Sequence, residues 1–64
     1  MESYNLKTGE NEETPKKVIK FLEDLEALCR IHNVSISHED GGRFELDEFD
    51  EYNIEWVRKA NLNL

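Results

Sequence analysis

Two short runs that alternate between apolar and polar residues flank a pair of glycines in the segment SISHEDGGRFEL. Alternation with a period of two is typical of a β-strand with one buried face, and glycines between two such runs indicate a hairpin turn. Val34, Ile36 and His38 share one face of the first run, and Phe44 and Leu46 share one face of the second. The segment therefore predicts a β-hairpin, and the rest of the chain must cover its apolar face.

Burial also predicts the register of this hairpin. A two-residue loop would set the core face of one strand against the solvent face of the other, which burial disfavours. A three-residue loop that ends at Gly42, in the left-handed position of a G1 bulge, avoids this conflict. The predicted cross-strand pairs are Ile36–Leu46, His38–Phe44 and, on the outer face, Glu39–Arg43.

A long amphipathic helix is predicted before the hairpin. Thr14 is typical of an N-cap, and Pro15 is typical of a first helical position. Asn33 is a residue that ends helices in the left-handed conformation. Between them, apolar residues recur at spacings of three and four, as one face of a helix requires. This stripe consists of Val18, Phe21, Leu22, Leu25, Leu28, Cys29 and His32.

A second, shorter helix is predicted after the hairpin, roughly over residues 50–60. Either Asp47 or Asp50 is expected to cap it, because a carboxylate accepts hydrogen bonds from the first backbone N–H groups of a helix. Acidic residues precede basic residues along this segment, which suits the helix dipole. The expected apolar stripe consists of Phe49, Tyr52, Trp56, Val57 and Ala60.

These elements give an α+β fold in the order α-β-β-α, with two helices packed on a β-hairpin. Residues 1–13 are polar and are predicted to form a flexible tail, although SYNLKT could add as a short edge strand, and residues 14–64 are predicted to form one domain. A two-stranded sheet is marginal by itself, and the single Cys29 allows no internal disulfide. Either both helices cover one face of the hairpin, or two chains pair their hairpins into a four-stranded sheet in a homodimer.

The acidity of the chain lies in its second half. The net charge is −7, and the segment from residue 39 to residue 55 carries eight acids and one base. Such a charge argues against direct binding to nucleic acid or anionic lipid, because both require cations that neutralise phosphate. We call the predicted partner-binding residues the acidic surface. They are Glu39, Asp40, Glu45, Asp47, Glu48 and Glu51. The alternative is a solvated face that only keeps the protein soluble.

The predicted location is the cytoplasm. No apolar run is long enough to span a membrane, and the first fifteen residues have neither the basic nor the apolar region of a signal peptide. A lone cysteine suits a reducing compartment.

The turn residues His38, Glu39 and Asp40 are the alternative candidate site, for a small ligand or a metal ion. An imidazole and two carboxylates are suitable ligand groups. However, adjacent strand residues face opposite sides, and Asp followed by glycines is ordinary turn chemistry. His32 and Cys29 are interpreted as packing residues of the helix stripe. We expect no catalytic residue, no cofactor and no enzyme activity, since no assembled active-site motif is present.

The segment ALCRIHNVSISHEDGGRFELDEFDEYNIEWVRKA resembles small uncharacterised proteins of bacteriophages and prophages. The resemblance covers about residues 27–60 and depends on the strings SISHEDG and NIEW. Where those proteins continue with Gly-x-Gly-x-Phe, this chain has the shorter GGRF, so no shared ligand site at the turn is implied. The resemblance implies an accessory protein in a host cytoplasm that binds a host enzyme or defence component, a DNA-mimic inhibitor being one form.

Overall fold

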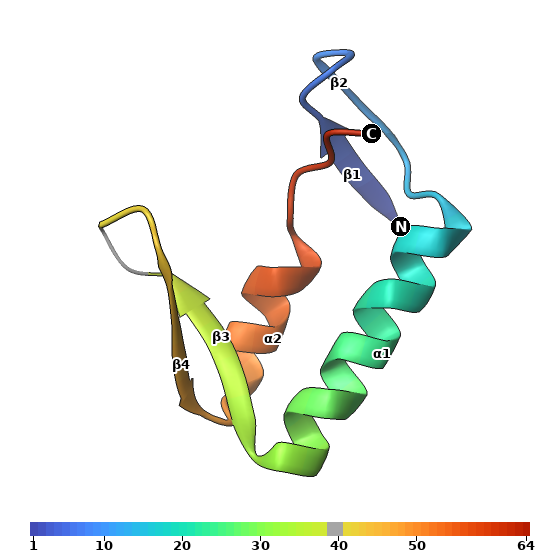
Figure 1. The fold of residues 1–64 in the computed structure, drawn as a ribbon. Coiled ribbons are helices and arrows are strands. Elements are labelled where there is room, and N and C mark those ends of the chain that lie inside the picture. The colour runs from blue at the N-terminus through green and yellow to red at the C-terminus, as the bar shows by residue number, and fades with distance from the viewer. Residues whose placement is uncertain (39–40) are drawn as a thin grey trace.

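The computed structural model describes residues 1–38 and 41–64. One antiparallel hairpin lies at one end of two neighbouring helices and the other lies alongside the second helix (Figure 1), and the two hairpins do not join into one sheet. The elements are β1 (Glu2–Asn5), β2 (Glu10–Glu13), α1 (Lys16–His32), β3 (Val34–His38), β4 (Phe44–Glu48) and α2 (Glu51–Arg58). The α+β class is confirmed, but the predicted order α-β-β-α is wrong, because the order is β-β-α-β-β-α.

The first hairpin occupies the segment that was expected to be a flexible tail. Its inward residues are small and polar rather than apolar. Ser3 and Asn5 are buried in β1, and Ser3 Oγ lies 2.7 Å from Thr14 Oγ1. Thr14 is therefore held by β1 and makes no capping bond, and α1 begins at Lys16, one residue later than expected. Composition alone gave no sign of this arrangement.

The C-terminal segment completes the first hairpin. Leu62 is buried and forms a parallel bridge with Asn5 on the edge of β1 that β2 leaves open. The Leu62 N–H donates to the Tyr4 carbonyl at 2.8 Å, and the Leu6 N–H donates to the Leu62 carbonyl at 2.8 Å. Both termini consequently lie at the same end of the molecule (Figure 1).

The end of α1 and the register of the second hairpin agree with the prediction. Asn33 adopts the left-handed conformation with a φ of 56°, and its N–H donates to the Cys29 carbonyl. Gly42 has a φ of 81°, as the bulged turn requires. The pairs Ile36–Leu46 and His38–Phe44 are present. The predicted Glu39–Arg43 pair lies outside the described residues, because Glu39 is one of the two that the structure leaves out.

The second helix begins where Asp50 caps it. The Asp50 carboxylate accepts a hydrogen bond from the Tyr52 N–H at 2.8 Å, so the alternative cap, Asp47, is not used. The predicted apolar stripe is wrong for Tyr52 and Trp56, which are 79% and 44% exposed, and for Ala60, which is also exposed. Ile54, which the prediction omitted, is the buried residue of α2.

A buried hydrogen bond explains the orientation of α2. Asn53 Nδ2 donates to Ser35 Oγ at 2.9 Å, and Ser35 Oγ donates to the Glu48 carbonyl at 3.0 Å. Ser35 is 0% exposed, although strand alternation placed it on the outer face. The side of α2 that carries Asn53 and Ile54 therefore faces inward, whereas Tyr52 faces solvent.

The core is small. In the part of the chain that the structure describes, the buried apolar residues are Cys29, Ile54 and Leu62. The predicted α1 stripe is only partly correct, because Phe21, Leu28 and His32 are exposed, so the predicted packing role of His32 is wrong. The Cα radius of gyration is 12.5 Å, whereas a compact domain of this length would have about 10.7 Å. The fold is therefore more open than its chain length requires.

Candidate functional site

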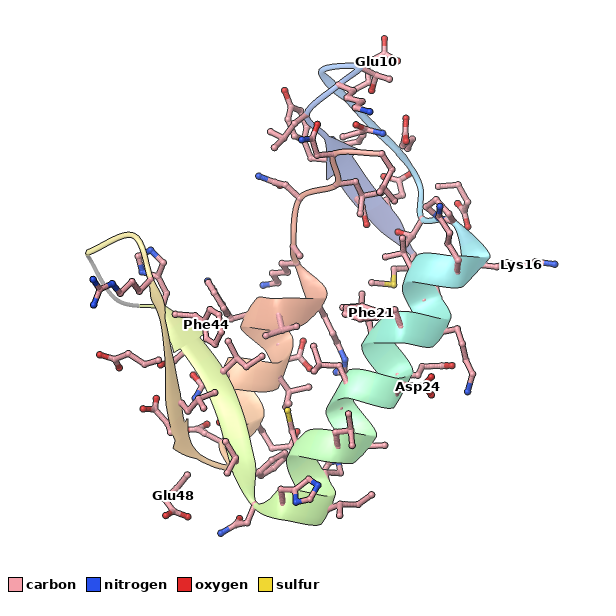
Figure 2. All side chains as sticks on the ribbon, viewed as in Figure 1. Glu10, Lys16, Phe21, Asp24, Phe44 and Glu48 are labelled. Carbon is pink, nitrogen blue, oxygen red and sulfur yellow. The ribbon has the colours of Figure 1, made fainter. Side chains whose placement is uncertain are left out.

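Strand β4 is exposed along its whole length. Alternation places Phe44, Leu46 and Glu48 on one face and Glu45 and Asp47 on the other. Phe44 and Leu46 are 65% and 66% exposed, which is high for large apolar residues. Figure 2 shows Phe44 near one end of this hairpin and Glu48 near the other. A surface strand with exposed side chains on both faces is available for recognition.

The acidic surface is divided in the structure. Glu39 and Asp40 lie outside the described residues. Glu48 shares a face with Phe44 and accepts from Asn33 Nδ2 at 2.9 Å. On the opposite face, Glu45 and Asp47 accept from the neutral side chains of Ser37 at 3.5 Å and Asn53 at 3.4 Å. The described part of the chain places no cation within ion-pair distance of Glu45, Asp47 or Glu48. All three residues are exposed to solvent.

Glu51, the sixth predicted member, also takes part in an ion-pair network between the helices. Its carboxylate lies 2.8 Å from Arg30 Nη2, and Arg30 also pairs with Glu26 of its own helix. Glu26 accepts in turn from Arg58 of α2, which pairs with Glu55 at 2.6 Å. The network joins α1 to α2, so Glu51 serves the fold. Sequence reasoning missed it, although the i,i+4 spacing of Glu26 and Arg30 was a visible signal.

The two arginines determine the ionisation of this network. Hydrogen bonds from Arg30 and then from Arg58 lower the pKa of Glu26 below its ordinary value of 4.5. The hydrogen bond to Glu51, followed by that to Glu26, raises the pKa of Arg30. Arg30 also lies over the ring of Phe49, at 4.8 Å from the ring centroid. The lowered pKa of Glu26 and the raised pKa values of Arg30 and Arg58 keep these three groups charged near neutral pH.

An apolar face lies on the other side of the second hairpin, and we define it as Val34, Ile36, Phe44 and Leu46. Two shallow grooves meet at this face and share Ile36. One, of about 420 Å³, runs beside α2 and is lined by Ile36, Phe44, Trp56, Val57, Lys59, Ala60 and Asn61. The other, of about 270 Å³, runs beside α1 and is lined by Leu28, Cys29, His32, Val34, Ile36 and Leu46. The helices flank this face but leave β4 uncovered.

His38, the described member of the alternative ligand site, is exposed. Its ring centroid lies 5.9 Å from that of Trp56, with the two rings tilted by 55°. Glu39 and Asp40, its proposed co-ligands, lie outside the described residues. No group of three His, Cys, Asp or Glu side chains able to hold a metal ion occurs in residues 1–38 and 41–64. The predicted packing role of Cys29 is consistent with its burial. The ligand site stays a prediction.

Neither of the two helices in the described ranges has the length and apolar character needed to cross a lipid bilayer. Comparison of the chain with protein-family models, with curated protein sequences and with solved structures gives no match. Function is therefore inferred from the residues and their geometry alone.

Proposed function

We propose that this chain is a non-enzymatic protein-binding module that contacts a basic surface of a partner protein through β4. The observation that carries the proposal is the set of three carboxylates, Glu45, Asp47 and Glu48, which are exposed and have no cation within ion-pair distance in the described part of the chain. Complementary charge steers association and selects partners more than it adds raw affinity. A basic surface is therefore the chemistry that this strand would recognise.

A protein partner fits this surface better than a nucleic acid, because a chain with a net charge of −7 repels phosphate. The resemblance to bacteriophage and prophage proteins supports a host protein in the bacterial cytoplasm as the partner. A host protein that grips nucleic acid, or one that acts in defence, presents such a basic surface. The carboxylates of β4 would then occupy the place of phosphates.

A charge-reversal experiment tests the proposal. The triple variant Glu45→Lys, Asp47→Lys, Glu48→Lys should abolish capture of a basic protein from a bacterial host lysate and leave the circular dichroism spectrum unchanged. Binding of the purified partner to the wild-type chain should weaken steeply as salt screens the charges.

The matched control reverses the same amount of charge elsewhere, in the variant Glu2→Lys, Glu10→Lys, Glu23→Lys. These side chains are exposed and lie away from β4. The control should keep the binding of the wild type. Equal loss in both variants would show that net charge alone is responsible, and binding that does not depend on salt would contradict the proposal.

A second candidate function is a structural homodimer, which the exposure of Phe44 and Leu46 favours. In a monomer these side chains would face water, and in a dimer they could pack against the same residues of a second copy. The pairing geometry of β4 indicates how the two copies would contact each other.

A further inference from the structure

We propose that β4 pairs antiparallel with β4 of a second copy, so that the two hairpins form one four-stranded sheet with Glu45 at the twofold axis. Within the described residues, β4 pairs only with β3, so its outer edge lacks a partner strand. The edges of the first hairpin differ from the outer edge of β4. Leu62 bonds to the outer edge of β1, and β2 carries the polar sequence ENEE. Exposed strand edges that carry apolar side chains are templates for pairing with another chain.

The ladder of the second hairpin shows which peptide groups reach this edge. The Phe49 N–H donates to the Asn33 carbonyl at 3.2 Å, which makes Asn33 and Phe49 a hydrogen-bonded pair. Such pairs alternate along an antiparallel ladder. The peptide groups of Phe44 and Leu46 therefore point away from β3, toward the open edge, where a second strand can bond to them, whereas the Glu48 carbonyl accepts from Ser35 of β3.

Side-chain chemistry selects one register among those that a twofold axis allows. A twofold axis that passes between Leu46 of one copy and Leu46 of the other would place Glu45 opposite Asp47 of the second copy. Like charges would then face each other. An axis at Phe44 would leave most of β4 without a partner. An axis at Glu45 instead pairs Phe44 with Leu46 of the second copy and Arg43 with its Asp47, and each of these pairs occurs twice. It also makes Phe44 and Leu46 a hydrogen-bonded pair, as their outward peptide groups require.

The exposed area is sufficient for such an interface. The chain exposes 5034 Å², whereas a monomeric protein of 7.6 kDa would expose about 4300 Å². The excess of about 700 Å² approaches the roughly 800 Å² that each partner buries in a standard interface. Phe44 and Leu46 contribute to this excess. The proposed dimer uses the same strand as the proposed partner surface but does not depend on that partner.

The register has an electrostatic consequence at the axis. The two Glu45 carboxylates would lie opposite each other, and directly opposed like charges destabilise a sheet. Replacing Glu45 with Gln should therefore strengthen the dimer several-fold, and added salt should also strengthen it. Binding of a basic partner has the opposite salt dependence, because salt weakens attraction between unlike charges.

Cysteine cross-linking tests the register. Glu45→Cys, made together with Cys29→Ser, should form a disulfide-linked dimer in a glutathione redox buffer, because opposed residues of a non-hydrogen-bonded pair have Cα atoms about 4.5 Å apart. Asp47→Cys in the same background should not, since the two introduced sulfurs would belong to residues offset by about 13 Å along the strands. Glu10→Cys on β2, in the same background, measures the rate of cross-linking by random collision. Cross-linking of Glu45→Cys no faster than that of Glu10→Cys would overturn the proposal.

Sedimentation equilibrium provides a test that needs no cysteine. The wild-type chain should populate dimers, Glu45→Gln should populate more, and Leu46→Pro should sediment as a monomer. Proline at this position removes only an outward N–H, so the ladder between β3 and β4 is preserved. A wild-type chain that sediments as a monomer at high salt would overturn the dimer. Leu46→Pro keeps all the carboxylates, so this monomeric variant should still bind the basic partner. A wild-type chain that is monomeric but binds the partner would overturn the dimer alone, and a dimeric chain that binds no basic partner would overturn the proposed function alone.

Discussion

At the scale of single residues, polar side chains with partners in other elements determine the arrangement. Ser35 sits on a face that alternation assigns to solvent, yet it is fully buried because Asn53 donates to it. Glu26 likewise lies on α1 but binds Arg58 of α2. Hydrophobic periodicity reports which residues avoid water, and it carries no information about which polar groups will find each other. These contacts were therefore absent from the prediction.

Glu26→Gln should lower the free energy of unfolding at neutral pH, because it removes the carboxylate that bridges Arg30 and Arg58. The loss should exceed that of Asp24→Asn, which breaks only an exposed i,i+4 pair with Lys20. Urea titrations of both variants measure the difference. Equal losses would mean that the interhelical network contributes no more than a surface pair.

The same variant predicts a pH dependence with a definite sign. The pKa of Glu26 is lower in the folded chain than its ordinary value of 4.5. Its contribution to stability is therefore fully present above pH 4.5 and is lost as the pH falls through the folded-state pKa. The wild type and Glu26→Gln should differ most near neutral pH and converge in acid, which urea midpoints across a pH series would show. A constant difference would contradict the assignment.

At the scale of elements, local signals predicted where helices and turns begin and end, but not which way they face. Asp50, Gly42 and Asn33 each take the conformation that their residue type favours. These signals need only neighbours in sequence. The inward face of α2 depends on β3 and α1, so an aromatic stripe drawn from spacing alone wrongly included Tyr52 and Trp56.

Asp50→Ala should destabilise the chain by about 1 kcal/mol, because the Tyr52 N–H loses its side-chain acceptor. In a domain of this size that corresponds to a fall in Tm of roughly 4–8 °C. Asp47→Ala is the matched control, since it removes an equal charge near the same helix without a capping bond. Thermal denaturation followed by circular dichroism compares them. A larger loss for Asp47→Ala would contradict the observed cap.

At the scale of the whole molecule, segments far apart in sequence close the fold. The prediction located α1, β3, β4 and α2 but missed the first hairpin, whose inward residues Ser3 and Asn5 are polar and whose third partner is Leu62. A strand held by contacts from such a distant segment leaves no local pattern. The same reason limits what could be predicted of the candidate site. The sequence predicted that alternate residues of β4 lie on opposite faces, because that pattern lies within one hairpin.

Leu62→Ala should destabilise the chain by about 2–5 kcal/mol, as truncation of a buried leucine does. The backbone amides of Leu6 and residue 62 should then exchange with deuterium faster, because they bond across this contact. Leu64→Ala, at an exposed position, should have little effect. Hydrogen exchange followed by NMR measures both variants. Unchanged protection at Leu6 would show that the bridge adds nothing to the first hairpin.

The bridge between Asn5 and Leu62 also has a consequence for how the chain is made. A ribosome delivers β1 before both helices and the second hairpin, and it delivers Leu62 only after them. During that part of synthesis one edge of β1 has no partner. The contact with Leu62 then closes a loop that contains all the other elements. Contacts between such distant residues form late in folding, because their closure entropy is the largest among these elements. A strand translated before the helices would thus reach its native bonding after them.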